Sequence, residues 1–199
     1  MGTDFYEAVE SRRTFYHIGK QSTVSDERLI SVVENAILHC PTAFNSQSGR
    51  VLLLLNKNHE RLWALAAEAL RPVVPAGDFA KTEEKLNSFS SGYGTLLFYE
   101  DQQVVQGLQS RFPLYKDNFP IWSQQASGML QYIVWVALES EGLGVSLQHY
   151  SPLIDAPVAA EWKVPAEWKL IGQMPFGKPT SGPDEKQFLP VEDRIRIYK

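Results

Sequence analysis

The feature that most limits how this chain can fold is the long apolar segment from Ile121 to Leu143. Its apolar residues recur every three or four positions, the spacing of one helical face, while Trp135 and Val136 widen the apolar arc. A helix that is apolar on nearly all sides needs partners on nearly all sides, so we predict the central helix of the domain, in a monomer core or also at a subunit interface. A membrane span would avoid the polar residues within it, which are Gln124, Gln125, Gln131, Glu139 and Glu141.

Shorter helical and extended patterns alternate along the rest of the chain. Helices are expected over residues 4–11, 26–39, 59–70 and 79–89. Buried strands are expected over 51–55 and 94–99, and further strands over 144–147 and 170–174. Ser25 is expected to cap the second helix, whose inward residues would be Leu29, Ile30, Val33 and Ile37. Residues 101–120 are expected to connect elements, 175–184 to be irregular and 194–197 to form an edge strand. This mixture predicts a sheet sandwiched by helices.

Length and composition restrict the class of protein. The chain has 199 residues, which predicts a single domain over residues 1–199. Its net charge of −4 does not suit a protein that binds a nucleic-acid backbone. A single cysteine, Cys40, excludes an internal disulfide framework, and no histidine has a partner at metal-ligand spacing, so we expect no metal site. The acidic N-terminal residues lack a signal pattern, which predicts a cytoplasmic protein.

Arg12, Arg13 and Thr14 follow the first expected helix. Two guanidinium groups and a hydroxyl can hold a phosphate dianion, because their N–H and O–H donors match its oxygens in pairs. The alternative is that both arginines cap the helix end and contact water.

Two further segments carry polar groups at expected sheet ends. In the loop from Pro41 to Ser48, Asn45 and Gln47 can bond the edge of a heterocycle, or the loop is only a turn that leads into the strand. His149, in the stretch from Gly142 to Tyr150, is the best titratable candidate, although a histidine there can equally be structural. No Lys or Arg adjoins Cys40 in the sequence to support a thiolate nucleophile there.

Taken in order, these segments resemble the nitroreductase family of flavoproteins over nearly the whole chain. The segment from Ser11 to Thr14 is similar to the family's phosphate-binding motif, and that from Pro41 to Gln47 to its Pro-Ser-x-x-Asn-x-Gln loop. Residues 92–101 and 146–154 resemble short fungal and bacterial members that are called copper-induced or fatty-acid-repressed nitroreductases. The chain departs from the family at Tyr16, at Ser48-Gly49, and at Gln148-His149, where relatives carry a basic residue, Pro-Trp and Glu-Gly.

The resemblance implies an α+β fold with three helix/sheet/helix layers, a mostly antiparallel sheet, a long central helix and a C-terminal tail that extends onto the partner of an obligate homodimer. It also implies FMN at the subunit interface. The residues that it places near the phosphate and ribityl chain are Arg12, Arg13, Thr14, Lys186 and, less directly matched, Arg194. Those that it places near the flavin ring are Asn45, Ser46, Gln47, Lys85, Gln148 and His149.

The implied activity is that of an NAD(P)H oxidoreductase that reduces nitroaromatics, quinones or similar small acceptors by a ping-pong hydride-transfer mechanism. No side chain need be essential, and His149 is the one candidate proton donor or ring-positioning residue. One alternative is a flavin-binding sensor or storage protein with little turnover, whose ring would be covered by Tyr16, Phe44, Phe112 and Tyr115. Another is an interaction protein that has lost FMN. The sequence names neither the physiological acceptor nor the preferred nicotinamide.

Overall fold

One antiparallel sheet organises the chain, for which a computed structural model describes residues 4–199. The strand order is β1-β5-β3-β2, and β4 pairs with β5 beside this row. β3 is the central strand; it pairs with β2 on one side and with β5 on the other, where the register shifts between Phe98 and Tyr99. The strands are β1 (Ile18–Gly19), β2 (Gly49–Leu55), β3 (Gly94–Asp101), β4 (Gly144–Val145) and β5 (Trp168–Pro179).

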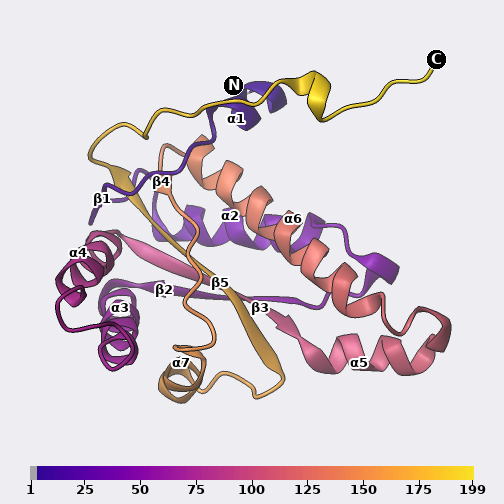
Figure 1. The fold of residues 1–199 in the computed structure, drawn as a ribbon, viewed down its shortest axis with the longest axis horizontal. Helices are drawn as coiled ribbons and strands as arrows, with labels where there is room; N and C mark the ends of the chain where they lie inside the picture. The colour runs from indigo at the N-terminus through magenta and orange to yellow at the C-terminus, as the bar shows by residue number, and fades with distance from the viewer. Residues whose placement is uncertain (1–3) are drawn as a thin grey trace.

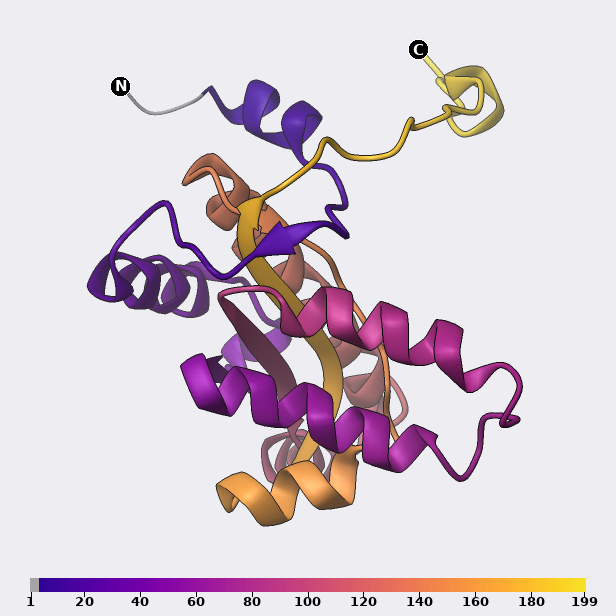
Figure 2. The same ribbon diagram turned by 90° about the vertical axis from the view of Figure 1, so that its left-hand side faces the viewer.

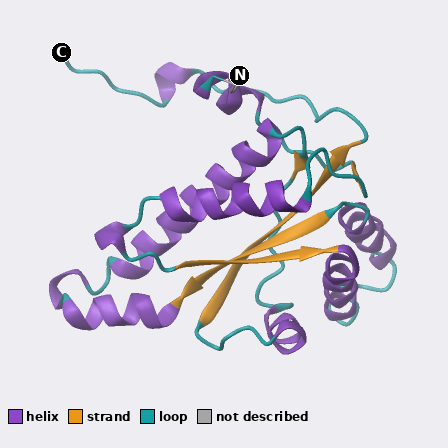
Figure 3. Cartoon of the chain, turned by 180° about the vertical axis from the view of Figure 1, so that it is seen from behind, coloured by secondary structure: helices purple, strands orange, loops and turns teal. Residues whose placement is uncertain are grey.

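Helices cover both faces of this sheet (Figures 1 and 3). α2 and α6 lie on one face, and α3, α4 and α7 lie on the other. The α+β, three-layer prediction is therefore confirmed. The helices are α1 (Phe5–Ser11), α2 (Asp26–His39), α3 (Asn56–Leu70), α4 (Phe79–Ser90), α5 (Gln102–Arg111), α6 (Phe119–Ser140) and α7 (Asp155–Trp162), with short 3-10 turns η1 (Ala43–Asn45), η2 (Pro113–Tyr115) and η3 (Val191–Asp193).

Alternation along β3 explains how one sheet supports two cores. Leu96 and Phe98 pack against α2 and α6, whereas Leu97 and Tyr99 pack against α3, α4 and α7. Successive side chains of a strand point to opposite faces, so a central strand with apolar residues at the consecutive positions 96–99 can bury both faces. All eight residues of β3 are buried, as the sequence predicted for residues 94–99.

The edge strand β2 and its neighbour α2 differ from the prediction. Of β2, only Leu54 is buried, because the strand has a partner on one side alone. On α2, Ser25 Oγ accepts from Arg28 N at 3.2 Å as the expected cap. Leu29 and Val33 point inward as predicted, but the predictions for Ile30 and Ile37 are wrong, since these side chains are 43% and 39% exposed.

The predictions for several other segments are also wrong. Residues 102–111 form α5 instead of a plain connection, and β5 continues through residues 175–179, which were expected to be irregular. α7 was not predicted. Residues 194–197 are not a strand; they follow η3 in an exposed tail that runs past α1 and away from the body of the molecule (Figures 1 and 2). Within residues 4–199, no helix combines the length and apolar character that crossing a bilayer requires.

Candidate functional site

A cationic pocket of about 360 Å³ joins the two ends of the chain. The segment after α1 contributes Arg12, Arg13 and Thr14, and the start of the tail contributes Lys186. The predicted phosphate residues from both ends therefore line one cavity, except Arg194, which lies further along the exposed tail at the end of η3. Sequence reasoning had not assigned the other lining residues to such a site; they are Tyr16, Asp184, Glu185 and Gln187.

One hydrogen bond holds the two walls of this pocket together. Arg13 Nη2 donates to the backbone carbonyl of Asp184, which ties the tail to the N-terminal segment. The Lys186 ammonium lies 4.9 Å from the centre of the Phe188 ring. Three basic side chains outnumber the two acidic ones, Asp184 and Glu185, so the pocket carries a net positive charge suited to an anion with several oxygens.

The loop between α2 and β2 has an unusual backbone. Phe44, Asn45 and Gln47 all lie in the left-handed region, with φ of 55°, 50° and 48°. Asparagine tolerates this region, but phenylalanine and glutamine rarely adopt it, so the surrounding structure must hold the loop in this shape. Thr42 does so in part: its Oγ1 accepts from Gln47 N at 3.0 Å, and its carbonyl accepts from Asn45 N at 3.0 Å.

Aromatic side chains surround this loop. The Phe44 ring lies 4.9 Å from that of Phe112, 5.9 Å from that of Tyr115 and 6.0 Å from that of Trp122 on α6, centre to centre. Three of the four residues named as a possible ring cover thus form one group. The fourth, Tyr16, belongs to the cationic pocket and does not join them within one chain.

The loop and the cationic pocket contact opposite ends of α6. Trp122 meets the loop, and Trp135 meets Arg12, whose guanidinium carbon is 4.7 Å from the centre of the indole ring. These two tryptophans are 13 positions apart, which corresponds to about 20 Å along an α-helix. One chain therefore does not bring Asn45, Ser46 and Gln47 together with Arg12, Arg13 and Lys186.

The other predicted ring residues lie in separate places. Lys85 is exposed on α4. The C-terminal end of α4 contacts β1, where Ser91 Oγ donates to the Ile18 carbonyl at 3.0 Å. Gln148 is buried; its side-chain amide donates to Ser146 Oγ at 3.2 Å, so it is engaged inside the chain. His149 is exposed and makes no hydrogen bond to another of the residues that the structure describes.

A buried carboxyl group lies beside the loop. Glu100 Oε2 accepts from Ser48 Oγ at 2.6 Å, and burial raises the pKa of Glu100 to about 6. Burial, and to a lesser extent the nearby Glu100, raise the pKa of the Cys40 thiol above its ordinary value. The thiol is thus protonated at neutral pH, which argues against a thiolate nucleophile at Cys40.

Comparison with known proteins gives a consistent family. A family model described as the Nitroreductase family matches residues 9–178. Nitroreductase FRM2 of Saccharomyces cerevisiae is 31% identical over 197 residues, covering 98% of this chain and 97% of the yeast protein.

Solved structures agree over almost the whole chain. Nitroreductase CinD from Lactococcus lactis, in complex with chloramphenicol, superposes with a TM-score of 0.91 at 43% identity, covering 98% of this chain and 100% of that one. CinD has also been solved with 4-nitrophenol and with nicotinic acid. A nitroreductase with bound FMN from Desulfitobacterium hafniense has the same fold, with a TM-score of 0.72 at 15% identity over 100% of both chains.

Proposed function

The chain belongs to the nitroreductase family, and from this premise we propose that it is an FMN-dependent NAD(P)H oxidoreductase that reduces small nitroaromatic or quinone-like acceptors. The observation that carries the proposal is the cationic pocket, in which residues from both ends of the chain surround a cavity of about 360 Å³. Complexes of the 43% identical CinD with chloramphenicol and 4-nitrophenol, both nitroaromatics, support the acceptor class.

The donors of the pocket suit the phosphate end of FMN. Arg12 and Arg13 supply planar sets of N–H donors, Thr14 a hydroxyl, and Lys186 an ammonium on a flexible stem from the tail. Each charge-assisted hydrogen bond to a phosphate oxygen contributes about 1.5–3 kcal/mol. The ribityl chain would continue along the same cavity toward Tyr16.

We infer that a second copy of the chain completes the site. Asn45, Ser46 and Gln47 would contact the flavin ring from the partner subunit, because in their own chain they lie about 20 Å along α6 from the cationic pocket. The strained backbone of this loop supports such a role, since residues in sparsely populated conformations cluster at binding sites. Lys85 would be the cation that stabilises negative charge on the reduced ring.

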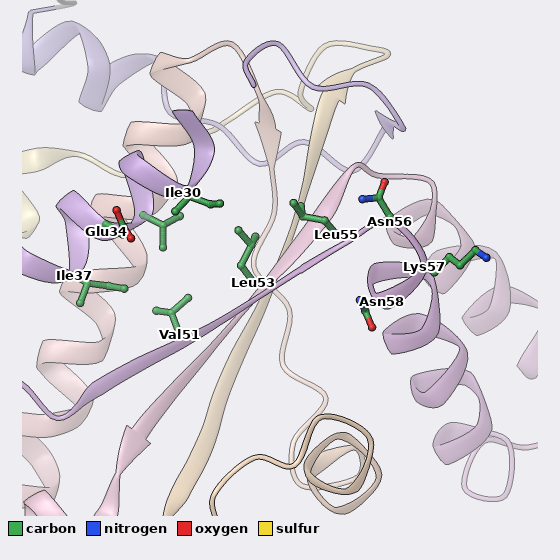
Figure 4. A pocket seen from close by; sticks show the side chains of 10 residues that line it. Ile30, Glu34, Ile37, Val51, Leu53, Leu55, Asn56, Lys57 and Asn58 are labelled. Carbon is green, nitrogen blue, oxygen red and sulfur yellow. The ribbon is translucent and has the colours of Figure 1, made fainter. Parts of the chain in front are cut away.

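Apolar surfaces left open in one chain support the homodimer. A groove of about 740 Å³ separates α2 from the edge strand β2, where Ile30 and Ile37 face Val51 and Leu53 (Figure 4). A second cleft, of about 470 Å³, lies between α1 and α6. We assign both surfaces to a second copy of this chain, whose apolar tail residues have no place on their own subunit: Phe188, Leu189, Val191, Ile195, Ile197 and Tyr198. Each subunit would be the single domain expected over residues 1–199.

FMN bound in this site would supply the redox chemistry, taking a hydride from a nicotinamide and delivering electrons to the acceptor. The chain's own residues would hold the phosphate, orient the ring and shape one slot that both substrates use in turn, which predicts ping-pong kinetics. His149 is exposed and free to donate a proton or to position a ring from the segment after β4.

Spectroscopy and rapid mixing test the proposal. The purified chain, saturated with FMN, should lose its yellow colour within seconds when mixed with NADH or NADPH in a stopped-flow instrument. It should regain the colour with 4-nitrophenol, chloramphenicol or a quinone. His149→Ala should slow one half-reaction while FMN stays bound; unchanged half-reactions would exclude a role for this residue.

The alternatives give different spectra. A sensor or storage protein, with its ring covered by groups such as Phe44, Phe112 and Tyr115, would bind FMN and keep its colour for minutes in the presence of either nicotinamide. An interaction protein that has lost the cofactor would be colourless and would ignore added FMN. Either outcome would overturn the proposed enzyme.

A further inference from the structure

Two side chains of α6 contact the segment that carries Arg12 and Arg13. Trp135 and Glu139 are four positions apart, so they lie one above the other on the same face of the helix. Trp135 Nε1 donates to Glu139 Oε1 at 2.6 Å, which locks the indole and the carboxyl group to each other. Neither residue was part of the predicted site.

This pair fixes the backbone of Arg13 at both of its polar groups. Arg13 N donates to Glu139 Oε2 at 2.8 Å, and the Arg13 carbonyl accepts from Trp135 Nε1 at 3.3 Å. Both oxygens of Glu139 therefore have a hydrogen-bond partner in this arrangement. The segment after α1 has no regular secondary structure at this point, so its hydrogen bonds to α6 determine where Arg13 lies.

The same pair also positions Arg12. The Arg12 guanidinium stacks over the Trp135 ring at 4.7 Å, and the hydrogen bond from Nε1 to Glu139 restricts rotation of that ring. The charged groups that act on Glu139 are Arg12 and Arg13, both from the segment after α1. Glu139 does not line the cationic pocket, but its hydrogen bonds to Arg13 and Trp135 set where the two arginines lie.

We propose that Glu139, acting through Trp135 and the backbone of Arg13, is the positioning residue of the phosphate pocket and sets the preference of this chain for FMN over unphosphorylated riboflavin. The inference rests on the proposed function, because it takes the flavin phosphate as the anion in the pocket. It goes beyond that function by assigning the selectivity to residues of α6 that do not line the pocket.

Flavin titrations of the full-length chain, stripped of cofactor, test the proposal. Dissociation constants for FMN and riboflavin are measured by flavin fluorescence at pH 7 for the wild type, for the single variants Glu139→Ala, Glu139→Gln and Trp135→Phe, and for the double variant E139Q/W135F. Glu10→Gln is the matched control, because Glu10 is an exposed glutamate of the adjacent α1 whose side chain makes no hydrogen bond or ion pair with the residues between 4 and 199.

We expect Glu139→Ala to weaken FMN binding by about tenfold or more and to leave riboflavin binding within about twofold. Glu139→Gln turns an amide N–H₂ toward the N–H of Arg13 or of Trp135, so two donors would face each other. Trp135→Phe removes one of these donors and keeps a ring beneath Arg12. The double variant E139Q/W135F should therefore bind FMN more tightly than Glu139→Gln alone, a rescue that general damage to the fold would not produce.

Three results would overturn the inference: unchanged FMN affinity in Glu139→Ala, equal weakening of FMN and riboflavin, or no rescue in the double variant. If Glu139→Ala does not fold, the glutamine variant and the double variant still decide the question. Failure of the proposed function looks different, because the wild-type chain would then bind neither flavin.

Discussion

Arg12 and Lys186 reach the same pocket from opposite ends of the chain, and their charges are the simplest to reverse. In Arg12→Glu combined with Lys186→Glu, the two attractive contacts that we propose to the phosphate would become repulsive. We expect the affinity for FMN to fall by more than about 100-fold, since each lost charge-assisted bond contributes about 1.5–3 kcal/mol. Riboflavin binding should change little. Equilibrium dialysis against both flavins provides the measurement.

The control for this charge reversal is Lys169→Glu. Lys169 is exposed near the start of β5, at the end of the strand opposite to the one that leads into the tail. If the double reversal at Arg12 and Lys186 binds FMN as tightly as Lys169→Glu does, the phosphate does not occupy the cationic pocket.

Glu139 should make FMN binding depend on pH. Burial raises the pKa of Glu139 to about 7, against the opposing effects of its hydrogen bonds from Arg13 and Trp135 and of the two nearby arginines. A phosphate dianion held by Arg12 and Arg13 would raise this pKa further, because like charges repel. Binding would then take up a proton, and a reaction that takes up a proton weakens as the pH rises.

We therefore expect the FMN dissociation constant of the wild type to rise between pH 7 and 9, by about twofold to tenfold in total. The second ionisation of the phosphate, near pH 6, is nearly complete by then and cannot cause the change. Glu139→Gln has no proton to take up, so its dissociation constant should stay level over the same range. Parallel slopes for the two proteins would show that Glu139 is not the titrating group.

Sequence reasoning predicted the local part of the candidate site but not the residues that support it. Arg12, Arg13 and Thr14 are adjacent, so their shared chemistry is visible in the chain itself. Glu139 is 126 positions from the Arg13 N–H that it accepts. The sequence shows that Trp135 and Glu139 are four positions apart and share one face of a helix. Only the fold decides that this face of α6 packs against the segment of Arg13.

At the scale of elements, a buried histidine joins two helices to the central strand. His59 on α3 is 2.8 Å from Thr95 Oγ1 on β3 through Nδ1, and Nε2 lies 3.2 Å from the carbonyl of Ser90 at the end of α4. Trp63 Nε1 also donates to Thr95 Oγ1, at 3.0 Å, so the threonine hydroxyl hydrogen is free to point at His59 Nδ1. Burial lowers the pKa of His59 to about 4.

This shift predicts how stability depends on pH. The unfolded chain binds a proton at His59 near pH 6.5, whereas the folded chain does so only near pH 4. Between these values the unfolded state holds more protons, so the free energy of unfolding must fall as the pH is lowered from 6.5 toward 4. For this one group the loss at pH 4.5 is about 2–3 kcal/mol.

Urea unfolding of the wild type and of His59→Asn at pH 7 and pH 4.5 isolates the contribution. The variant is expected to be less stable at pH 7, and its disadvantage should shrink by about 2–3 kcal/mol at pH 4.5. Other groups, such as Glu100, titrate in both proteins and cancel in the difference. A constant difference between the two proteins would mean that His59 titrates equally in both states.

Elements with strong periodic patterns were predicted well, and those that depend on their neighbours were not. The helix over residues 26–39 and the strand over 94–99 carry their own signals, a cap in one and an apolar run in the other. α5 was missed because it is largely polar, although Asp101 Oδ1 accepts from Gln103 N at 3.0 Å as an N-cap. The apolar run at residues 51–55 predicted a strand buried on both faces. It is instead an edge strand, and one of its faces lines an open groove.

At the scale of the whole molecule, these departures share a cause. We expect a second copy of the chain to cover the groove lined by Ile30, Ile37, Val51 and Leu53, which would explain why these residues are apolar. In a single subunit the groove is open. The alternation at residues 194–197, read as an edge strand, likewise lacks a partner within its own subunit. If the chain dimerises as proposed, these sequence patterns reflect burial in the assembled protein, which a single subunit does not display.

Removal of the tail tests this explanation directly. Truncation after Gln187 retains Lys186 and the whole cationic pocket but deletes six apolar residues, among them Tyr198, which is 93% exposed on its own subunit. If these residues pack on a second copy, each that is buried contributes about 1.5–3 kcal/mol to association. We expect sedimentation equilibrium to show a dimer for the full chain at micromolar concentration, and a dimer at least about 100-fold weaker for the truncated chain.

A second variant separates the tail from the rest of the interface. Met129→Glu places a charge in the apolar cleft between α1 and α6, which the tail truncation leaves intact, and it should also weaken the dimer. FMN affinity should fall together with dimerisation in both variants, because Asn45 and Gln47 would reach the ring only from the partner subunit. A truncated chain that stays monomeric yet binds FMN as tightly as the full chain would show that one subunit holds the whole site, and that the distance of about 20 Å between loop and pocket is closed within a single chain.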